Sequence, residues 1–295
     1  MLKKIGRFIV NLFFLIIISL AALIGLGDSE EFESDMPSAG QNDTFQGRSP
    51  SSQMGEPDQG ATLPLPGPFD DRSIVEAQDA INWSSGTGFA IASGGVWLTA
   101  KHVARGCDKL GIINENGQTR VKARALYISE IADVAIFQTE GGPSPLALDL
   151  DETDIKVGTR GFHVGYPQGK PGEVTSRLIG RELMLTQGAW RGKENTLAWA
   201  ETGRSTDLLG TLGGLSGGPA FDSKGNVVGI TIAESPRRGR IITTSATSIA
   251  AALSVADIVP SGQPLEASNT LMSPMTARQL RKDLKVVQVI CLTGS

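Results

Sequence analysis

One serine of this chain stands on an unusually bare stretch of backbone, a setting that suits nucleophilic chemistry. Ser216 lies in the segment GLSGGP at 214–219, where glycines permit backbone conformations that are closed to most side chains. A serine hydroxyl is a poor nucleophile at neutral pH. It needs a base, an acid that orients the base, and donors for the developing oxyanion. Ser216 is therefore a candidate nucleophile, with the amides of Gly214 and Ser216 as a candidate oxyanion hole. A tight turn is the alternative interpretation of the same segment.

A base for this serine must be one of the two histidines in the chain. His102 follows the apolar run of WLTAKHVA, so we expect it at a strand end beside a cleft. His163, in GFHVGYP, lies inside a strand pattern. Asp133 opens the apolar run of EIADVAIF and is the candidate acid that orients the base. Each of the three, taken alone, also fits a structural role.

The residues that must position these groups form many short apolar segments broken by turns. With 36 glycines and few long helical patterns, this texture predicts antiparallel β-barrels or sandwiches from about residue 72 onward. A short helix is expected at 248–253, capped by Ser248, and another from Ser273 followed by Pro274. The strand candidates are 86–100, 109–128, 133–140, 158–167, 172–183, 195–202, 225–234 and 240–247.

The N-terminal segment has the features of a membrane anchor. Three basic residues precede an apolar run from Phe8 to Leu26, long enough to cross the hydrocarbon core of a bilayer. A cleaved signal peptide ending near the SLA at 19–21 is the alternative. We predict a transmembrane helix at 1–27, a disordered linker at 28–70 that is rich in small and polar residues, and a C-terminal tail at 256–295.

Composition argues against several other classes of protein. The net charge is −4 and no basic patch stands out, which predicts no nucleic-acid partner. No C-x-x-C pair is present, so we expect no metal site, and nothing calls for a cofactor. Cys107 and Cys291 are either a disulfide or two buried thiols; outside the cytoplasm a disulfide is favoured.

The three motifs together resemble the chymotrypsin-like (trypsin-fold) serine peptidases. TAKHV matches that family's histidine motif, DVAIF its aspartate motif and GLSGGP its serine motif, in the family's order. The style is closest to bacterial HtrA-like peptidase domains, and the resemblance covers about residues 75–255. It implies two six-stranded antiparallel β-barrels, with His102, Asp133 and Ser216 in the cleft between them. His163 is then structural.

The resemblance also suggests where a substrate would lie. It implies a primary pocket bordered by Gly210, Leu212 and Gly239, open to an apolar side chain. The strand Ile232–Ala233–Glu234 would pair with the substrate backbone, and Glu234 would add a charge preference.

Two departures from the family pattern limit what carries over. Leu215 stands where the digestive peptidases carry an aspartate, which predicts no activation by insertion of a cleaved N-terminus. The tail after 253 is too short for a PDZ domain, so PDZ-gated proteolysis is not expected.

The sequence thus predicts a membrane-tethered serine endopeptidase acting on proteins or peptides, with its protease domain at 71–255. We expect it at a bacterial inner membrane with this domain in the periplasm or outside the cell, or secreted if the N-terminal segment is cleaved. A latent protease-fold binding or chaperone module is the alternative. Nothing in the sequence predicts the oligomeric state.

Overall fold

A computed structural model describes residues 60–77, 82–113, 120–266 and 272–294. The predicted transmembrane helix and most of the predicted linker lie outside these residues. Within the described ranges, no helix is long and apolar enough to cross a membrane. The predicted linker nevertheless ends earlier than residue 70. Leu63 is buried in the core of the domain, and its N–H donates to the Ile155 carbonyl at 2.8 Å.

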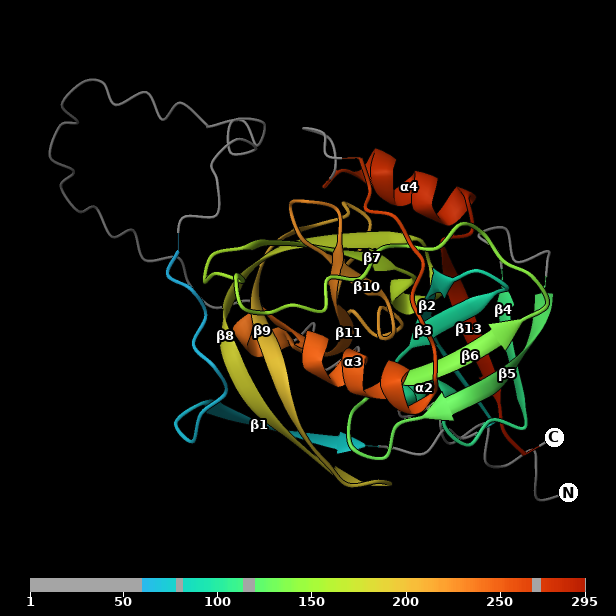
Figure 1. Cartoon of the computed structure of the whole chain (residues 1–295), viewed down its shortest axis with the longest axis horizontal. Coiled ribbons are helices and arrows are strands. Elements are labelled where there is room, and N and C mark those ends of the chain that lie inside the picture. The colour runs from blue at the N-terminus through green and yellow to red at the C-terminus, as the bar shows by residue number, and fades with distance from the viewer. Residues whose placement is uncertain (1–59, 78–81, 114–119, 267–271, 295) are drawn as a thin grey trace, which may run out of the picture. The chain divides into compact units, whose positions relative to one another are not determined.

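The first barrel contains a strand from the far end of the chain. Six strands close it in the order β13-β2-β3-β6-β5-β4. The C-terminal strand β13 lies between β2 and β4 and pairs antiparallel with both, and its red ribbon stands among the green strands of this barrel (Figure 1). The strands are β2 (Trp83–Ala92), β3 (Val96–Thr99), β4 (Lys109–Ile113), β5 (Arg120–Ile128), β6 (Ala135–Thr139) and β13 (Val286–Leu292).

The second barrel is built from a continuous stretch of chain and carries an added strand. Its sheet runs β1-β8-β7-β10-β11-β12-β9, and a further pairing between β8 and β9 joins six of these strands into a ring. β1 lies parallel to β8 on the outside, as Figure 1 shows along the long β8 ribbon. The strands are β1 (Asp71–Ala77), β7 (Arg160–Gly165), β8 (Gly172–Gly188), β9 (Gly192–Arg204), β10 (Pro219–Phe221), β11 (Val227–Ser235) and β12 (Arg240–Thr244).

The barrel interiors are filled by large apolar side chains. In the first barrel, Trp97 of β3 stacks on Phe137 of β6, with ring centroids 6.0 Å apart. Trp199 is fully buried in the second barrel, where its indole N–H donates to the Thr243 hydroxyl at 3.0 Å. The indole N–H of Trp97 donates in turn to the Thr139 hydroxyl at 2.8 Å, so both buried indoles have a hydrogen-bond partner.

Helices are few and short. α2 (Lys101–Ala104) is a single turn directly after β3. α3 (Ala246–Val255) is capped by Ser245, whose hydroxyl accepts from the Ser248 N–H. The predicted cap at Ser248 is therefore wrong, because the helix begins one turn earlier. α4 (Pro274–Lys282) begins as predicted, with Ser273 as its cap and a proline at the first helical position.

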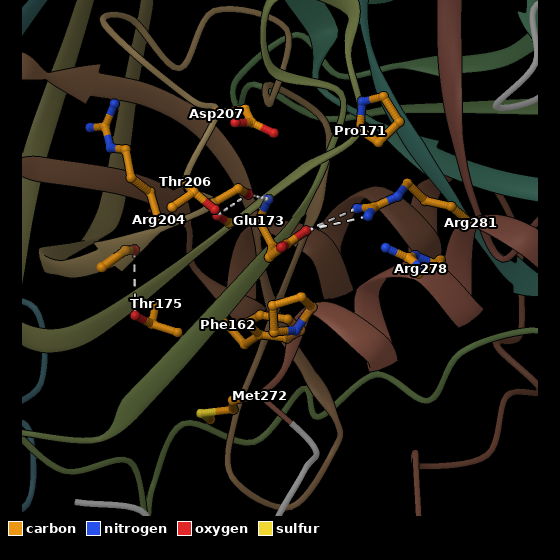
Figure 2. A pocket seen from close by; sticks show the side chains of 13 residues that line it. Phe162, Pro171, Glu173, Thr175, Arg204, Thr206, Asp207, Met272, Arg278 and Arg281 are labelled. Carbon is orange, nitrogen blue, oxygen red and sulfur yellow. Dashed lines mark hydrogen bonds and ion pairs between the residues drawn. The ribbon is translucent and has the colours of Figure 1, made fainter. Parts of the chain in front are cut away.

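The C-terminal segment is part of the domain rather than a tail packed on a finished one. Figure 2 shows Arg281 of α4 paired with Glu173 of β8 on the wall of a cavity, and their ion pair is 3.3 Å long. A disulfide joins Cys291 of β13 to Cys107, which follows α2. The predicted boundary at residue 255 is thus displaced, because the first barrel is open without β13.

Candidate active site

His102 and Asp133 are brought together by two neighbouring strands. β3 runs into α2, and Asp133 stands just before β6, which pairs with β3 so that Thr99 is opposite Ala135. The His102 Nδ1 lies 2.7 Å from Asp133 Oδ2, and the His102 main-chain N–H donates to Oδ1 at 3.0 Å. The Asp133 side chain is 5% exposed, whereas that of His102 is 32% exposed. The imidazole therefore has one nitrogen on a buried acid and an edge open to solvent.

The charge on Asp133 controls the protonation of His102. Burial lowers the pKa of His102, but the Asp133 charge and hydrogen bond together raise it above its ordinary value. With Nδ1 donating to the carboxylate, Nε2 of the neutral ring is free to accept a proton. This is the arrangement that a general base requires.

Ser216 reaches the same place from the second barrel. Its carbonyl accepts from the Thr87 N–H of β2 at 2.8 Å, while its neighbour Leu215 is fully buried. The approach is close, since a Cβ on Gly86 would lie 2.8 Å from the Ser216 carbonyl and 2.5 Å from a methyl of Val103 in α2. The half-buried Ser216 and Val103 of the turn that carries His102 therefore both border Gly86.

The loop before Ser216 leaves two N–H groups unused. Gly214 has a φ of +97°, and a Cβ there would meet the Tyr166 carbonyl at 2.5 Å. The Gly213 carbonyl accepts from the Gln168 N–H at 2.5 Å, and the Gly214 carbonyl accepts from the Thr87 hydroxyl at 2.7 Å. Among the described residues, nothing accepts from the N–H groups of Gly214 and Ser216. Both remain available to an external acceptor.

Two residues that hold this loop in place, Thr87 and Gln168, were not predicted from the sequence. The Thr87 hydroxyl also accepts from the Tyr166 N–H at 3.0 Å, so it links both barrels to the loop. Gln168 has a φ of +54°, and its side-chain amide donates to the carbonyls of Leu209 and Thr211. A polar threonine between glycines in an apolar strand is the only sequence signal for Thr87, and Gln168 has none.

Some of the predicted substrate-binding residues are exposed, whereas others are buried or already hydrogen-bonded within the protein. Gly210 and Gly239 both have positive φ, and Gly210 is exposed. Leu212 and Ile232 are each 4% exposed, and Leu212 packs in the core cluster of Leu215. The Glu234 carboxylate accepts from the Leu212 N–H at 2.8 Å and from the Thr211 hydroxyl. Glu234 therefore anchors the loop before Ser216. Its neighbour Ala233 is paired with Ile242 of β12.

A cavity of about 510 Å³ borders the start of the same loop (Figure 2). Arg204 on its wall donates to the Gly210 carbonyl at 2.7 Å. The cavity contains none of the three predicted catalytic residues. Its lining includes Phe162, Pro171, Glu173, Ser205, Asp207 and Arg281.

His163 occupies a purely internal position. It is fully buried in the second barrel, with Nε2 at 2.8 Å from the Ser176 hydroxyl and Nδ1 at 3.1 Å from that of Thr231. Burial lowers the pKa of His163 to about 3, so the ring is neutral. Over the parts of the chain that the structure describes, no group of three or more histidine, cysteine or acidic side chains is arranged to hold a metal ion.

Comparison with known proteins places this geometry in a family. Residues 86–230 match the model of the trypsin-like peptidase domain. A probable periplasmic serine endoprotease DegP-like from Pseudomonas putida (strain GB-1) is 29% identical over 147 residues, which are 50% of this chain and 28% of that protein. The protein of the same name from Ectopseudomonas mendocina (strain ymp) is 28% identical over 192 residues, 62% of this chain and 38% of the relative. The chain therefore spans roughly a third of the length of these curated relatives.

Solved structures of proteases are also similar. The active form of the Rv3671c protease from M. tuberculosis matches with a TM-score of 0.48 and 17% identity, covering 70% of this chain and 100% of that one. Residues 86–230, just under half of the chain, are therefore similar to the trypsin-like peptidase domain.

Proposed function

We propose that this protein is a serine endopeptidase that uses Ser216, His102 and Asp133. The observation that carries the proposal is the 2.7 Å contact between His102 Nδ1 and Asp133 Oδ2. Ser216 and Val103, the residue after His102, both border Gly86, which supports placing the serine near this pair. A buried acid on one ring nitrogen leaves the other to serve a nucleophile, which is the logic of the serine triad. The curated relatives named above are described as serine endoproteases, which supports the same reaction.

The chemistry follows from these roles. The Ser216 hydroxyl oxygen attacks the peptide carbonyl carbon, and its proton moves to Nε2 of His102. The N–H groups of Gly214 and Ser216 would then donate to the carbonyl oxygen as it becomes negative, which is why their lack of internal acceptors matters. The tetrahedral species collapses, and His102 gives its proton to the leaving amine. Water then cleaves the acyl ester by the same steps, releasing the acid and restoring Ser216.

The substrates that fit are proteins or peptides in extended form. The end of β11, at Ile232–Glu234, lies beside the loop of Ser216 and would offer its backbone to a substrate strand. Gly210 and Gly239 would border an open pocket for an apolar side chain. The Glu234 carboxylate is already bonded within the loop, so we do not assign it a charge preference.

The protein is proposed to act outside the cytoplasm, tethered by its N-terminal apolar segment. The disulfide between Cys107 and Cys291 supports this location, because such bonds persist in oxidising compartments. The description of the relatives as periplasmic supports it as well. Proteinase K added to intact spheroplasts should digest the domain of the full-length chain while a cytoplasmic marker survives. Protection of the domain until lysis would contradict the proposal.

The activity is tested by reaction with a fluorophosphonate, which labels only activated serines. We expect the full-length chain to be labelled and its Ser216→Ala variant to remain unlabelled. Ser254→Ala, at an exposed position of α3, is the matched control and should label like the wild type. A folded wild-type chain that does not label would overturn the assignment of Ser216 as a nucleophile.

A further inference from the structure

The hairpin between β8 and β9 reaches from the second barrel onto the histidine side of the first. At its tip, the Trp190 ring lies 4.2 Å from the ammonium of Lys101, the residue before His102. The carbonyl of Ala189 accepts from the Arg105 guanidinium at 3.2 Å, just beyond α2. β1 supports the tip in turn, since the Ala189 N–H donates to the Ala77 carbonyl at 3.0 Å. The hairpin is thus fixed on both sides and touches the turn that carries His102.

Glu194, near the start of β9, brings the hairpin into direct contact with the predicted acid. Its Oε2 accepts from the main-chain N–H of Asp133 at 2.8 Å, and the residue is only 4% exposed. Asp133 uses its two carboxylate oxygens on the ring and the main chain of His102. A continuous path of hydrogen bonds therefore runs from Glu194 through Asp133 to His102.

Burial favours the neutral form of Glu194 and outweighs the neighbouring groups that favour its charged form. Asp133 lies in front of it, Lys101 approaches from α2, and the Ser248 hydroxyl approaches from α3. Burial raises the pKa of Glu194 to about 8, and the Asp133 charge adds to this shift. The hydrogen bond from the Asp133 main chain, the Ser248 hydroxyl and the Lys101 charge oppose it. Its second oxygen, Oε1, is buried and forms no hydrogen bond within the part of the chain that the structure describes, so a charge on it would be poorly stabilised.

We propose that Glu194 is a positioning residue for the His102–Asp133 pair, holding the Asp133 main chain so that its carboxylate faces the imidazole. This inference rests on the proposed serine-peptidase function. An acceptor without charge suits the task, because a second carboxylate next to Asp133 would repel it and disturb its hold on His102. When Glu194 loses its proton in alkaline solution, that repulsion sets in and the pair is displaced.

The rate of fluorophosphonate labelling between pH 6 and pH 10 tests the role in the full-length chain. Glu194→Gln keeps the acceptor and cannot ionise, so we expect labelling within about twofold of the wild type at pH 7. Above about pH 8 the wild-type rate should fall while the Glu194→Gln rate holds. Glu194→Leu removes the acceptor and leaves a buried N–H unpaired, so labelling should slow by about 10- to 100-fold at every pH.

Glu182→Gln is the matched control in the same hairpin. Glu182 is a buried carboxylate on β8, opposite Thr196, and pairs with Arg240 at 2.7 Å, away from Asp133. Its substitution should alter stability and leave the shape of the pH profile unchanged. That profile is a readout which a merely structural role for Glu194 would not move.

The outcomes separate this inference from the function it rests on. If the wild type fails to label, the proposed function and the role of Glu194 fail together. If the wild type labels and Glu194→Leu labels equally fast, or Glu194→Gln retains the alkaline fall, only the role of Glu194 is overturned. Should Glu194→Leu fail to fold by circular dichroism, the profile of Glu194→Gln decides alone.

Discussion

The two barrels divide the site between them but are closed in different ways. The second barrel is formed by residues 160–244, a continuous stretch, and supplies Ser216 and its loop. The first barrel supplies His102 and Asp133, yet its ring is completed only by β13 at 286–292. The proposed base and acid therefore depend on a segment that follows the proposed nucleophile by some seventy residues in the chain.

This difference teaches where the site should be vulnerable. Pairings between distant segments must overcome a larger loop-closure entropy than local ones, so β13 is expected to be the costliest part of the fold to form. The disulfide lies at this place, joining β13 to the segment after α2. We therefore expect the histidine half of the site to lose order before the serine half.

Breaking the closing strand should have the largest effect. Val289 of β13 is fully buried, and a carboxylate there would have no partner, so Val289→Asp should cost about 4 kcal/mol or more. Hydrogen exchange should accelerate over 86–139 more than over 160–244. Leu292→Asp, at a 39% exposed position of the same strand, is the control and should change little. Equal acceleration in both barrels would show that they unfold as one unit.

Removing the disulfide should have the next largest effect. The bond joins residues 184 positions apart, and opening such a loop should lower the free energy of unfolding by about 3–5 kcal/mol. Paired Cys107→Ser and Cys291→Ser substitutions should shift the denaturant midpoint as much as reductant shifts that of the wild type. A wild-type midpoint that is insensitive to reductant would rule out a structural role for the bond.

The positions of His102 and Asp133 could be predicted because local pattern was enough. An apolar strand runs into His102 and another begins after Asp133, and neighbouring strands in a barrel bring such ends together. The partner of β13 could not be predicted in this way. Its short apolar sequence, rich in β-branched residues, indicates a strand, but no local signal says that it pairs with residues 83–89.

The length of the β8–β9 hairpin was also beyond local reasoning. Strands were expected at 172–183 and 195–202, whereas β8 runs to Gly188 and β9 begins at Gly192. The added residues include Thr186 and Glu194, which are polar and yet buried. Neighbouring elements cover these residues, and such tertiary contacts decide where a strand ends more than the β-propensity of single residues does. Glu194 and Thr87 act across the barrels, so only the assembled fold reveals them.

The hydrogen bonds of Thr87 between the two barrels offer a test with a smaller expected loss of stability. Thr87→Val removes the hydroxyl that accepts from Tyr166 and donates to Gly214, and should cost about 1–3 kcal/mol. Fluorophosphonate labelling should also slow, because the loop of Ser216 loses an anchor. Thr139→Val is matched: its hydroxyl likewise accepts from a buried N–H, of Trp97, and donates to the Gly141 carbonyl, within the first barrel alone. It should cost similar stability and leave labelling unchanged. Equal labelling losses in both variants would refute the role of Thr87.

The last test distinguishes the two barrels by their response to acid. The pKa of His163 is about 3 in the folded state and 6.5 is its ordinary value, so the unfolded chain binds the extra proton between these limits. The stability due to neutral His163 is complete above about pH 6.5 and is lost as the pH falls, by up to about 1.4 kcal/mol per pH unit.

His163→Gln should flatten this slope of unfolding free energy against pH, whatever it costs at neutral pH. Thr231→Val removes a hydroxyl partner of the ring but keeps the titrating group, so its slope should match that of the wild type. His102 has the opposite pH dependence. Its pKa is raised in the folded state, so its contribution to the stability of the first barrel is present in acid and is lost as the pH rises through that pKa. Acid should therefore open the second barrel first, the reverse of what reduction does. A slope shared by the wild type and His163→Gln would show that the buried imidazole is not what makes this barrel sensitive to acid.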